Sequence, residues 1–270
     1  MAKIYPLDKV LSANVTYETE KDRYYVVKKI GTNIADAVVP RIAGVPTTKI
    51  HADFAPLHKT TSNFHGPLDL GLKYIVIPPE RKFVFESATA GRVRIIGDLV
   101  VLSPGESILG EHLARFGVQD RDYITYVEGS FTIPGGAPWP AGVEFTVFSL
   151  TPPIIDEYTF KSYVFARVLN TGAPLSEGQV GVKFYLNDVP FDILTAIAGP
   201  FGIDILSMPW IPAGTTELTP FSLENYPIVV PGGHTFTVKF VNISGASISP
   251  ATGQNLIMQF RAIAHWIRKA

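Results

Sequence analysis

The stretch YPIVVPGGHTFTVKFVNIS, residues 226–244, is the clearest indication of the fold class of this chain. In its second half apolar residues alternate with polar ones: Phe236, Val238 and Phe240 against Thr235, Thr237 and Lys239. Successive side chains of a β-strand point to opposite faces. The alternation therefore predicts a strand that buries its apolar set in a core and turns its polar set toward solvent or another subunit.

A proline and a turn precede this strand. Pro231 lacks an amide donor and ends the apolar run before it, and Gly232 and Gly233 allow the backbone to reverse. The same device occurs in YIVIPPERKFVFES, residues 74–87, so that Pro78 and Pro231 stand 153 positions apart (231 − 78). Related units occur in PWPAGVEFTVF and PWIPAGTTEL. The repetition indicates the turn chemistry of β-sandwiches, and an internal duplication would also explain it.

The rest of the chain agrees with an all-β class. Hydrophobic residues make up 46% of the sequence and charged residues 17%, which is enough for a packed core. Further segments rich in Val, Ile, Phe, Tyr and Thr are bounded by Gly, Pro or Asn, as strands are. We expect an antiparallel β-sandwich with one or two short helices. The first is expected at 103–117, where Ser103 is the N-cap and Glu106 its partner, with a hairpin turn in LSPGESI as the alternative, because Gly105 and Gly110 disfavour a helix. The second is expected at 192–199.

The domain organisation follows from prolines and from one aperiodic segment. Pro152 and Pro153 interrupt the chain, so we expect two sandwich units, 1–152 and 153–270, each with one copy of the strand–proline–turn device. A loop between two strands of one large sandwich is the alternative. Residues 40–71 show no clear period and hold several prolines, which predicts a long ordered loop or an arm.

Composition excludes several kinds of site. The chain has no cysteine, which removes disulfides, zinc thiolates and cysteine nucleophiles, and its net charge of −1 comes without a basic cluster for nucleic acid. The sequence holds no signal-peptide-like start and no apolar run of membrane-spanning length, so we expect neither a signal peptide nor a transmembrane segment.

No motif names a reaction. His51, His58 and His65 show no His-x-His or Glu-x-x-His spacing, and Pro56 between the first two argues against a shared helical face. They are expected to be loop or surface residues. Four acidic residues near strand ends would permit a β-sandwich hydrolase only if two of them met in space: Asp120, Asp122, Asp156 and Glu157. We predict no enzyme, no catalytic residue, no metal ligand and no cofactor.

Aromatic residues in loops suggest contacts instead. Trp139 and Trp210 lie in apolar, proline-rich turns, and Phe54 and Phe64 lie in the 40–71 segment. An indole beside proline can stack on a sugar, plug the end of a sandwich or anchor a neighbouring subunit. We therefore predict these four residues as interface candidates, with a glycan- or host-surface-binding module as the alternative function.

Alternating strands joined by IPPERKFVFE and VVPGGHTFTVKF turns, with an apolar final strand and no cysteine, resemble jelly-roll coat or accessory proteins of virions, such as phage and archaeal-virus capsid subunits. The resemblance rests on no diagnostic motif, so no site residue is carried over. It implies a jelly-roll-like sandwich and a structural, self-assembling subunit of a virion or comparable assembly, partnered by further copies or other coat subunits. The N-terminus departs from it by not being strongly basic, which argues against direct packaging of nucleic acid.

Overall fold

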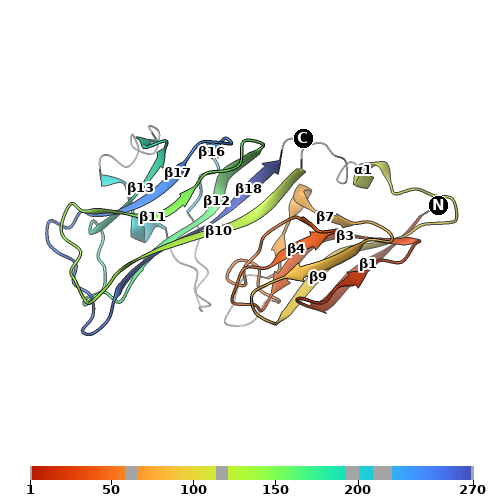
Figure 1. The fold of residues 1–270 in the computed structure, drawn as a ribbon, viewed down its shortest axis with the longest axis horizontal. Coiled ribbons are helices and arrows are strands. Elements are labelled where there is room, and N and C mark those ends of the chain that lie inside the picture. Colours follow the sequence, from red (N-terminus) through yellow and green to blue (C-terminus); the bar gives the residue numbers. More distant parts are fainter. Residues whose placement is uncertain (1, 59–65, 114–120, 192–200, 209–220, 269–270) are drawn as a thin grey trace. The chain divides into compact units, whose positions relative to one another are not determined.

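The computed structural model describes residues 2–58, 66–113, 121–191, 201–208 and 221–268, and these form an all-β protein (Figure 1). The chain divides into two compact units. Described residues up to Tyr126, together with those from Trp266 onward, form the first unit, and described residues from Val127 to His265 form the second. The antiparallel sandwich class expected from the alternating strands is confirmed.

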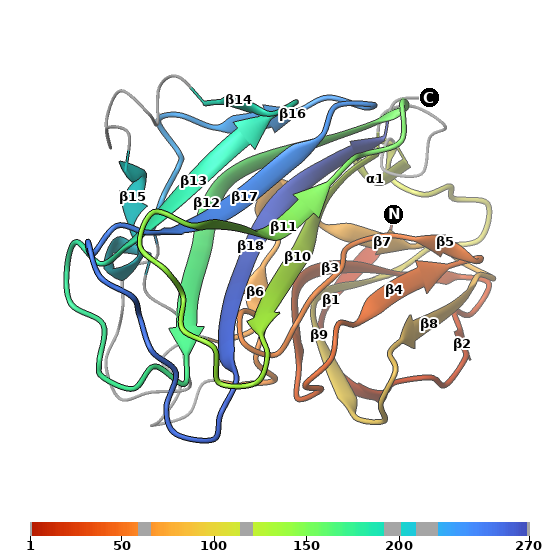
Figure 2. The ribbon, with the colours of Figure 1, turned by 60° about the vertical axis from the view of Figure 1, so that its left-hand side comes forward.

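The described residues of the first unit form two antiparallel sheets. In one sheet, β9 (Arg92–Val101) pairs with β1 (Lys3–Ser12) on one side and with β3 (Arg23–Thr32) on the other. The short strands β6 (Leu68–Asp69) and β7 (Ile75–Ile77) both pair with β3. In the other, β2, β8, β4 and β5 lie side by side (Figure 2): Tyr17–Glu18, Lys82–Glu86, Val39–Ile42 and Val45–Pro46.

The described residues of the second unit also form two sheets. One has the order β10, β18, β12 and β16: Arg121–Ile133, Leu256–Arg268, Asp156–Leu169 and Ile228–Val230. The other has the order β11 (Glu144–Leu150), β17 (Phe236–Asn242), β13 (Val180–Leu186) and β14 (Val189–Pro190). The short strand β15 (Ile203–Asp204) also pairs with β13.

Both units have the same topology once the short β6 and β15 are set aside. In each, one sheet has the order first–eighth–third–sixth strand and the other has the order second–seventh–fourth–fifth. This is the strand order of a jelly roll, in which two Greek keys wrap into two sheets. The two strand–proline–turn devices are therefore the same connection in both units, between the sixth strand (β7 or β16) and the seventh (β8 or β17).

The two turns also agree in backbone conformation. Glu80 and Gly233, again 153 positions apart (233 − 80), both have a left-handed φ, at 55° and 79°. Phe83 and Phe236 follow at the same spacing and are both buried. The repeated sequence device thus marks a repeated three-dimensional unit.

Aromatic rings from both sheets fill the core of the second unit. Phe236 of β17 lies 4.8 Å from Phe160 of β12, and Phe148 of β11 lies 5.3 Å from Phe260 of β18, measured between ring centroids. Phe236, Val238 and Phe240 are each 0% exposed, as the alternation predicts.

The polar face of β17 is more covered than the sequence predicts. Lys239 is half-buried, and its ammonium lies 4.5 Å from the centre of the Tyr185 ring. Thr237 is covered further and is only 7% exposed. The reason is the central position of β17, because Thr237 lies between Ser149 of β11 and Tyr185 of β13.

The first unit has apolar residues on both faces of its larger sheet. On the face toward the second sheet, the Tyr25 ring meets that of Phe83 at 6.1 Å. On the other face, Tyr24, Val26 and Val100 form a smaller cluster with Ile108 packed against it. The segment after β9 thus covers this face.

The boundary between the units differs from the predicted one. It lies within β10, after Tyr126, rather than at Pro152 and Pro153. Residues 144–150 form β11, and they pair along β17, so they belong to the second sandwich. Pro152 and Pro153 therefore lie in a loop between two strands of one unit, β11 and β12.

Helical structure is shorter than predicted. The described part of 103–117 contains only the short helix α1, Gly110–Leu113. The helix does not begin at Ser103 because Gly105 adopts a left-handed φ of 82°, and residues 103–106 form a turn instead. The Glu106 carboxylate accepts a 2.9 Å hydrogen bond from the Ser103 amide in this turn. In the described part of the chain, 3-10 turns occur at Gly71–Lys73 (η1) and Ile205–Ser207 (η3). The helix expected at 192–199 lies outside the described residues. No described helix combines the length and hydropathy that a transmembrane span requires.

Candidate functional site

Trp139, an interface candidate, is a core residue of the second unit. Its side chain is 0% exposed, and its indole Nε1 donates a 2.9 Å hydrogen bond to the carbonyl of Val143. Its backbone exchanges two hydrogen bonds with Ile248, and its carbonyl accepts from the buried Asn242 amide at 2.8 Å. The indole therefore closes its own sandwich and has no surface to offer a sugar or a neighbouring subunit.

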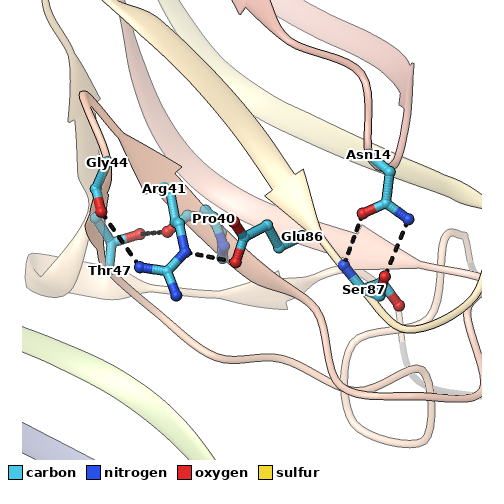
Figure 3. A network of polar contacts seen from close by, with 7 residues as sticks. All are labelled: Asn14, Pro40, Arg41, Gly44, Thr47, Glu86 and Ser87. Carbon is cyan, nitrogen blue, oxygen red and sulfur yellow. Dashed lines mark hydrogen bonds and ion pairs between the residues drawn. The ribbon is translucent and has the colours of Figure 1, made fainter.

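The predicted arm at 40–71 begins as part of the first unit. Residues 39–46 form the β4–β5 hairpin, which pairs with β8. Figure 3 shows how polar contacts hold it: the Arg41 guanidinium pairs with Glu86 and donates to the Gly44 carbonyl at 3.2 Å, and the Thr47 hydroxyl donates to Pro40 at 3.0 Å. The start of this segment is therefore a sheet edge and not a free arm.

A second contact in Figure 3 holds Ser87, the residue that follows β8. The Asn14 amide nitrogen donates to the Ser87 carbonyl, and the Ser87 amide donates back to the Asn14 oxygen, both at 3.0 Å. This reciprocal pair ties residues 73 positions apart. The network in Figure 3 is therefore structural, because each of these contacts joins one strand or turn of the unit to another.

Phe54 is half-buried against its own unit. Its ring lies 5.3 Å from that of Tyr126, and the buried His51 stacks on the same tyrosine at 4.9 Å. Ile50 of the same segment is 1% exposed. The described part of 47–58 thus folds over its parent sandwich. Phe64 and Trp210, the other two interface candidates, lie outside the described residues.

The strongest candidate site is one that the sequence reasoning did not single out, the turn end of the second unit. Three turns meet there: 151–155 between β11 and β12, 187–188 between β13 and β14, and 231–235 between β16 and β17. The Thr151 and Thr235 hydroxyls lie 2.8 Å apart, and the Gly233 amide donates to the Pro152 carbonyl at 2.9 Å. The Asn187 side chain accepts from the Thr235 amide at 2.9 Å. These contacts lock the three turns together.

Apolar side chains project from this locked end. Ile154 is 87% exposed, Ile155 is 52% exposed and Val189 is 61% exposed. We call these three residues the apolar tip. The backbone beneath is closely packed, because a Cβ on Gly232 would lie 2.3 Å from the Ile154 carbonyl oxygen. The tip is thus an apolar surface on a rigid support, and the sequence signal that could have found it is the Ile-Ile pair after two prolines.

The histidines do not form a metal site in the described part of the chain. His51 and His112 are buried, His58 and His234 are exposed, and His65 lies outside the described residues. His234 lies in the turn end, with its Nδ1 2.7 Å from the Asn187 amide nitrogen. No group of three or more His, Asp or Glu residues that could hold a metal ion occurs among the residues described.

The acidic candidates have separate environments. Asp122 pairs with Lys73 of the first unit. Asp156 is 3% exposed at the start of β12, and its neighbour Glu157 is half-buried. As consecutive strand residues, they point to opposite faces. Asp120 lies outside the described residues, so the structure brings no two of the four acids into one described site.

Two of the described tyrosines, Tyr24 and Tyr185, have raised pKa values. Burial raises the pKa of Tyr24, whose hydroxyl lies 2.9 Å from His112 Nδ1 inside the small cluster of the first unit. Burial and the nearby Glu144 carboxylate raise the pKa of Tyr185, and Glu144 also pairs with Lys183 at 2.5 Å. Both phenols therefore stay protonated at neutral pH and act as hydrogen-bonding groups.

Comparison with known proteins gives no family assignment. No protein-family model matches the chain, and no curated protein matches it. A conserved protein of unknown function from Pseudomonas aeruginosa PAO1 is 8% identical over 97% of this chain and 79% of its own, with a TM-score of 0.21. Chains in structures of two strains of infectious bursal disease virus are each 12% identical in sequence, with a TM-score of 0.23. The match covers 98% of this chain for the Gx strain and 99% for the Gt strain, and 78% of the viral chain in both. Similarity at this level carries no argument about this chain.

Proposed function

We propose that this chain is a structural, self-assembling subunit of a virion or a comparable protein assembly, and that its partners are further copies of itself or other coat subunits. The observation that carries the proposal is the apolar tip of the second unit. A structural role requires no catalytic residues, and the proposal assigns none.

The tip has the physical character of a contact surface. Burying an exposed isoleucine or valine side chain contributes about 1.5–3 kcal/mol. The locked turns beneath Ile154 and Ile155 reduce the conformational entropy lost when a partner covers them. Aliphatic side chains on a preorganised support thus favour association more than the same residues on a free loop.

The tandem jelly rolls support the proposal in a weaker way. Virus capsids use jelly-roll domains, but lectins and cupins use them too. The fold alone therefore does not choose among these functions. The apolar tip favours assembly over sugar recognition, because a sugar-binding surface needs hydrogen-bonding groups and aromatic faces at the exposed position.

The glycan-binding alternative loses one of its two tryptophans. Trp139 is 0% exposed and hydrogen-bonded inside the core of its own unit, so it cannot stack on a sugar. Trp210 lies outside the described residues. The hydrolase alternative gains no paired acids among the described residues, and neither alternative is better supported than assembly.

The test is multi-angle light scattering of the purified full chain across a wide concentration range, with electron microscopy of the concentrated sample. We expect association in the wild type and a large reduction in Ile154→Asp. Leu72→Asp is the matched control, because Leu72 is 86% exposed in the first unit and lies outside the tip. A wild-type monomer at every concentration refutes assembly, and equal association of the wild type and Ile154→Asp refutes the tip as the contact.

A further inference from the structure

The first unit contains a pocket at one end of its jelly roll. By strand order, this end corresponds to the end of the second unit that carries the apolar tip. The pocket volume is about 520 Å³, within the roughly 300–1,000 Å³ that small-molecule sites occupy. Its walls are mainly aliphatic and aromatic: Ile42, Val45, Val76, Ile108 and Tyr123 are among them. Such a lining suits the apolar body of a small molecule.

One charged residue lines the pocket. Arg81 is exposed, and its guanidinium makes no ion pair with any described residue. Among the described lining residues it is the only one with a charge. A cation beside a cavity lined mainly by aliphatic and aromatic residues favours an anionic group at that point, since a guanidinium pairs well with a carboxylate or phosphate.

The backbone of Arg81 is fixed in place. It follows Glu80, whose left-handed φ of 55° makes the turn, and its amide donates to the Thr19 hydroxyl at 3.1 Å. The Thr19 amide donates back to the Arg81 carbonyl at 3.3 Å. The strand–proline–turn device of the first unit thus carries a cation, Arg81. The corresponding device of the second unit lies beside the apolar tip.

We propose that this pocket binds an amphipathic anion, a molecule with an apolar chain or ring and one carboxylate or comparable head group, with the head paired to Arg81. The site is independent of the proposed assembly contact, because the apolar tip belongs to the other unit. Either proposal can therefore fail without the other.

The test is isothermal titration calorimetry of the full chain with three probes that share one tail: decanoate, decanol and the decyltrimethylammonium cation, each below its micelle-forming concentration. We expect saturable one-to-one binding of decanoate, and binding of the cation at least about tenfold weaker, since a charge-assisted contact is worth about one decade in affinity. Arg81→Gln should weaken decanoate binding by about tenfold and leave decanol binding unchanged.

Two controls separate the pocket from general adsorption. Arg92→Gln removes another exposed arginine of the same unit that does not line the pocket, and it should leave decanoate binding unchanged. Val45→Trp fills the cavity and should abolish binding of decanoate and decanol, with Ile108→Trp as the substitute if thermal melting shows that Val45→Trp is unstable. The proposal is overturned by absent wild-type binding, by unchanged decanoate affinity in Arg81→Gln, or by retained binding in a folded, filled variant.

Discussion

Replacing Phe236 by alanine should strongly destabilise the second unit. The Phe236 ring is 0% exposed and meets three other rings, at 4.8 Å from Phe160, 6.0 Å from Phe184 and 6.1 Å from Phe148. Truncation of a core phenylalanine costs about 3–5 kcal/mol, as lost transfer energy plus the cavity that remains. Contacts to rings on both sheets limit collapse around that cavity, so we expect the upper part of the range, about 4–5 kcal/mol.

The assay is equilibrium urea unfolding followed by tryptophan fluorescence, to which Trp139 contributes from the same core. Phe240→Ala, at a second fully buried position of β17, should lose at least about 3 kcal/mol. Phe201→Ala is the control, since Phe201 is 61% exposed and surface changes stay within about 0.5 kcal/mol. Losses below about 1 kcal/mol at both Phe236 and Phe240 would show that the strand register is misread.

Three further perturbations test the fold at other points. Gly97→Ala should destabilise the first unit by more than about 1 kcal/mol in urea unfolding, because its Cβ would meet the Val26 carbonyl oxygen at 1.9 Å; an unchanged midpoint contradicts this. The hydrogen bond from Arg94 lowers the pKa of Asp8. The free energy of unfolding of the wild type should therefore exceed that of Asp8→Asn by a constant amount from pH 7 to 5, and this difference should shrink as the pH falls below about 4. A difference that grows on acidification would contradict the stabilising role of the charged Asp8. Asn242→Ala should cost about 2–3 kcal/mol, because the 0% exposed amide donates to two main-chain carbonyls at 2.8 Å; a cost under about 0.5 kcal/mol would mean that water replaces it.

The class of the fold could be predicted from local pattern. Alternation in 235–240 places Phe236, Val238 and Phe240 on one face of a strand, and that depends only on the two-residue period of extended backbone. The strand–proline–turn device is equally local, since a proline ends the ladder and the residue two positions after it takes a left-handed φ. Its recurrence at a spacing of 153 is visible in the sequence alone and motivates the expectation of two sandwich units.

The boundaries and the sites depend on pairing between distant residues. β11 belongs to the second unit because it pairs with β17, about 90 residues later, and no feature of residues 144–150 alone reveals that partner. The burial of Trp139 likewise depends on Ile248 and Asn242, which lie more than 100 positions away. A proline-flanked indole reads the same way in sequence whether it closes a core or faces a partner.

The turn ends show the same division most clearly. Two similar turns follow from the local sequence, because proline and a left-handed residue act within four positions of the chain. Their surroundings follow from the tertiary structure, which places Arg81 of one turn beside a mainly apolar pocket and the exposed Ile154 beside the other. The physical reason is that exposure is a property of the neighbours a side chain meets, and those neighbours come from loops that are remote in the sequence.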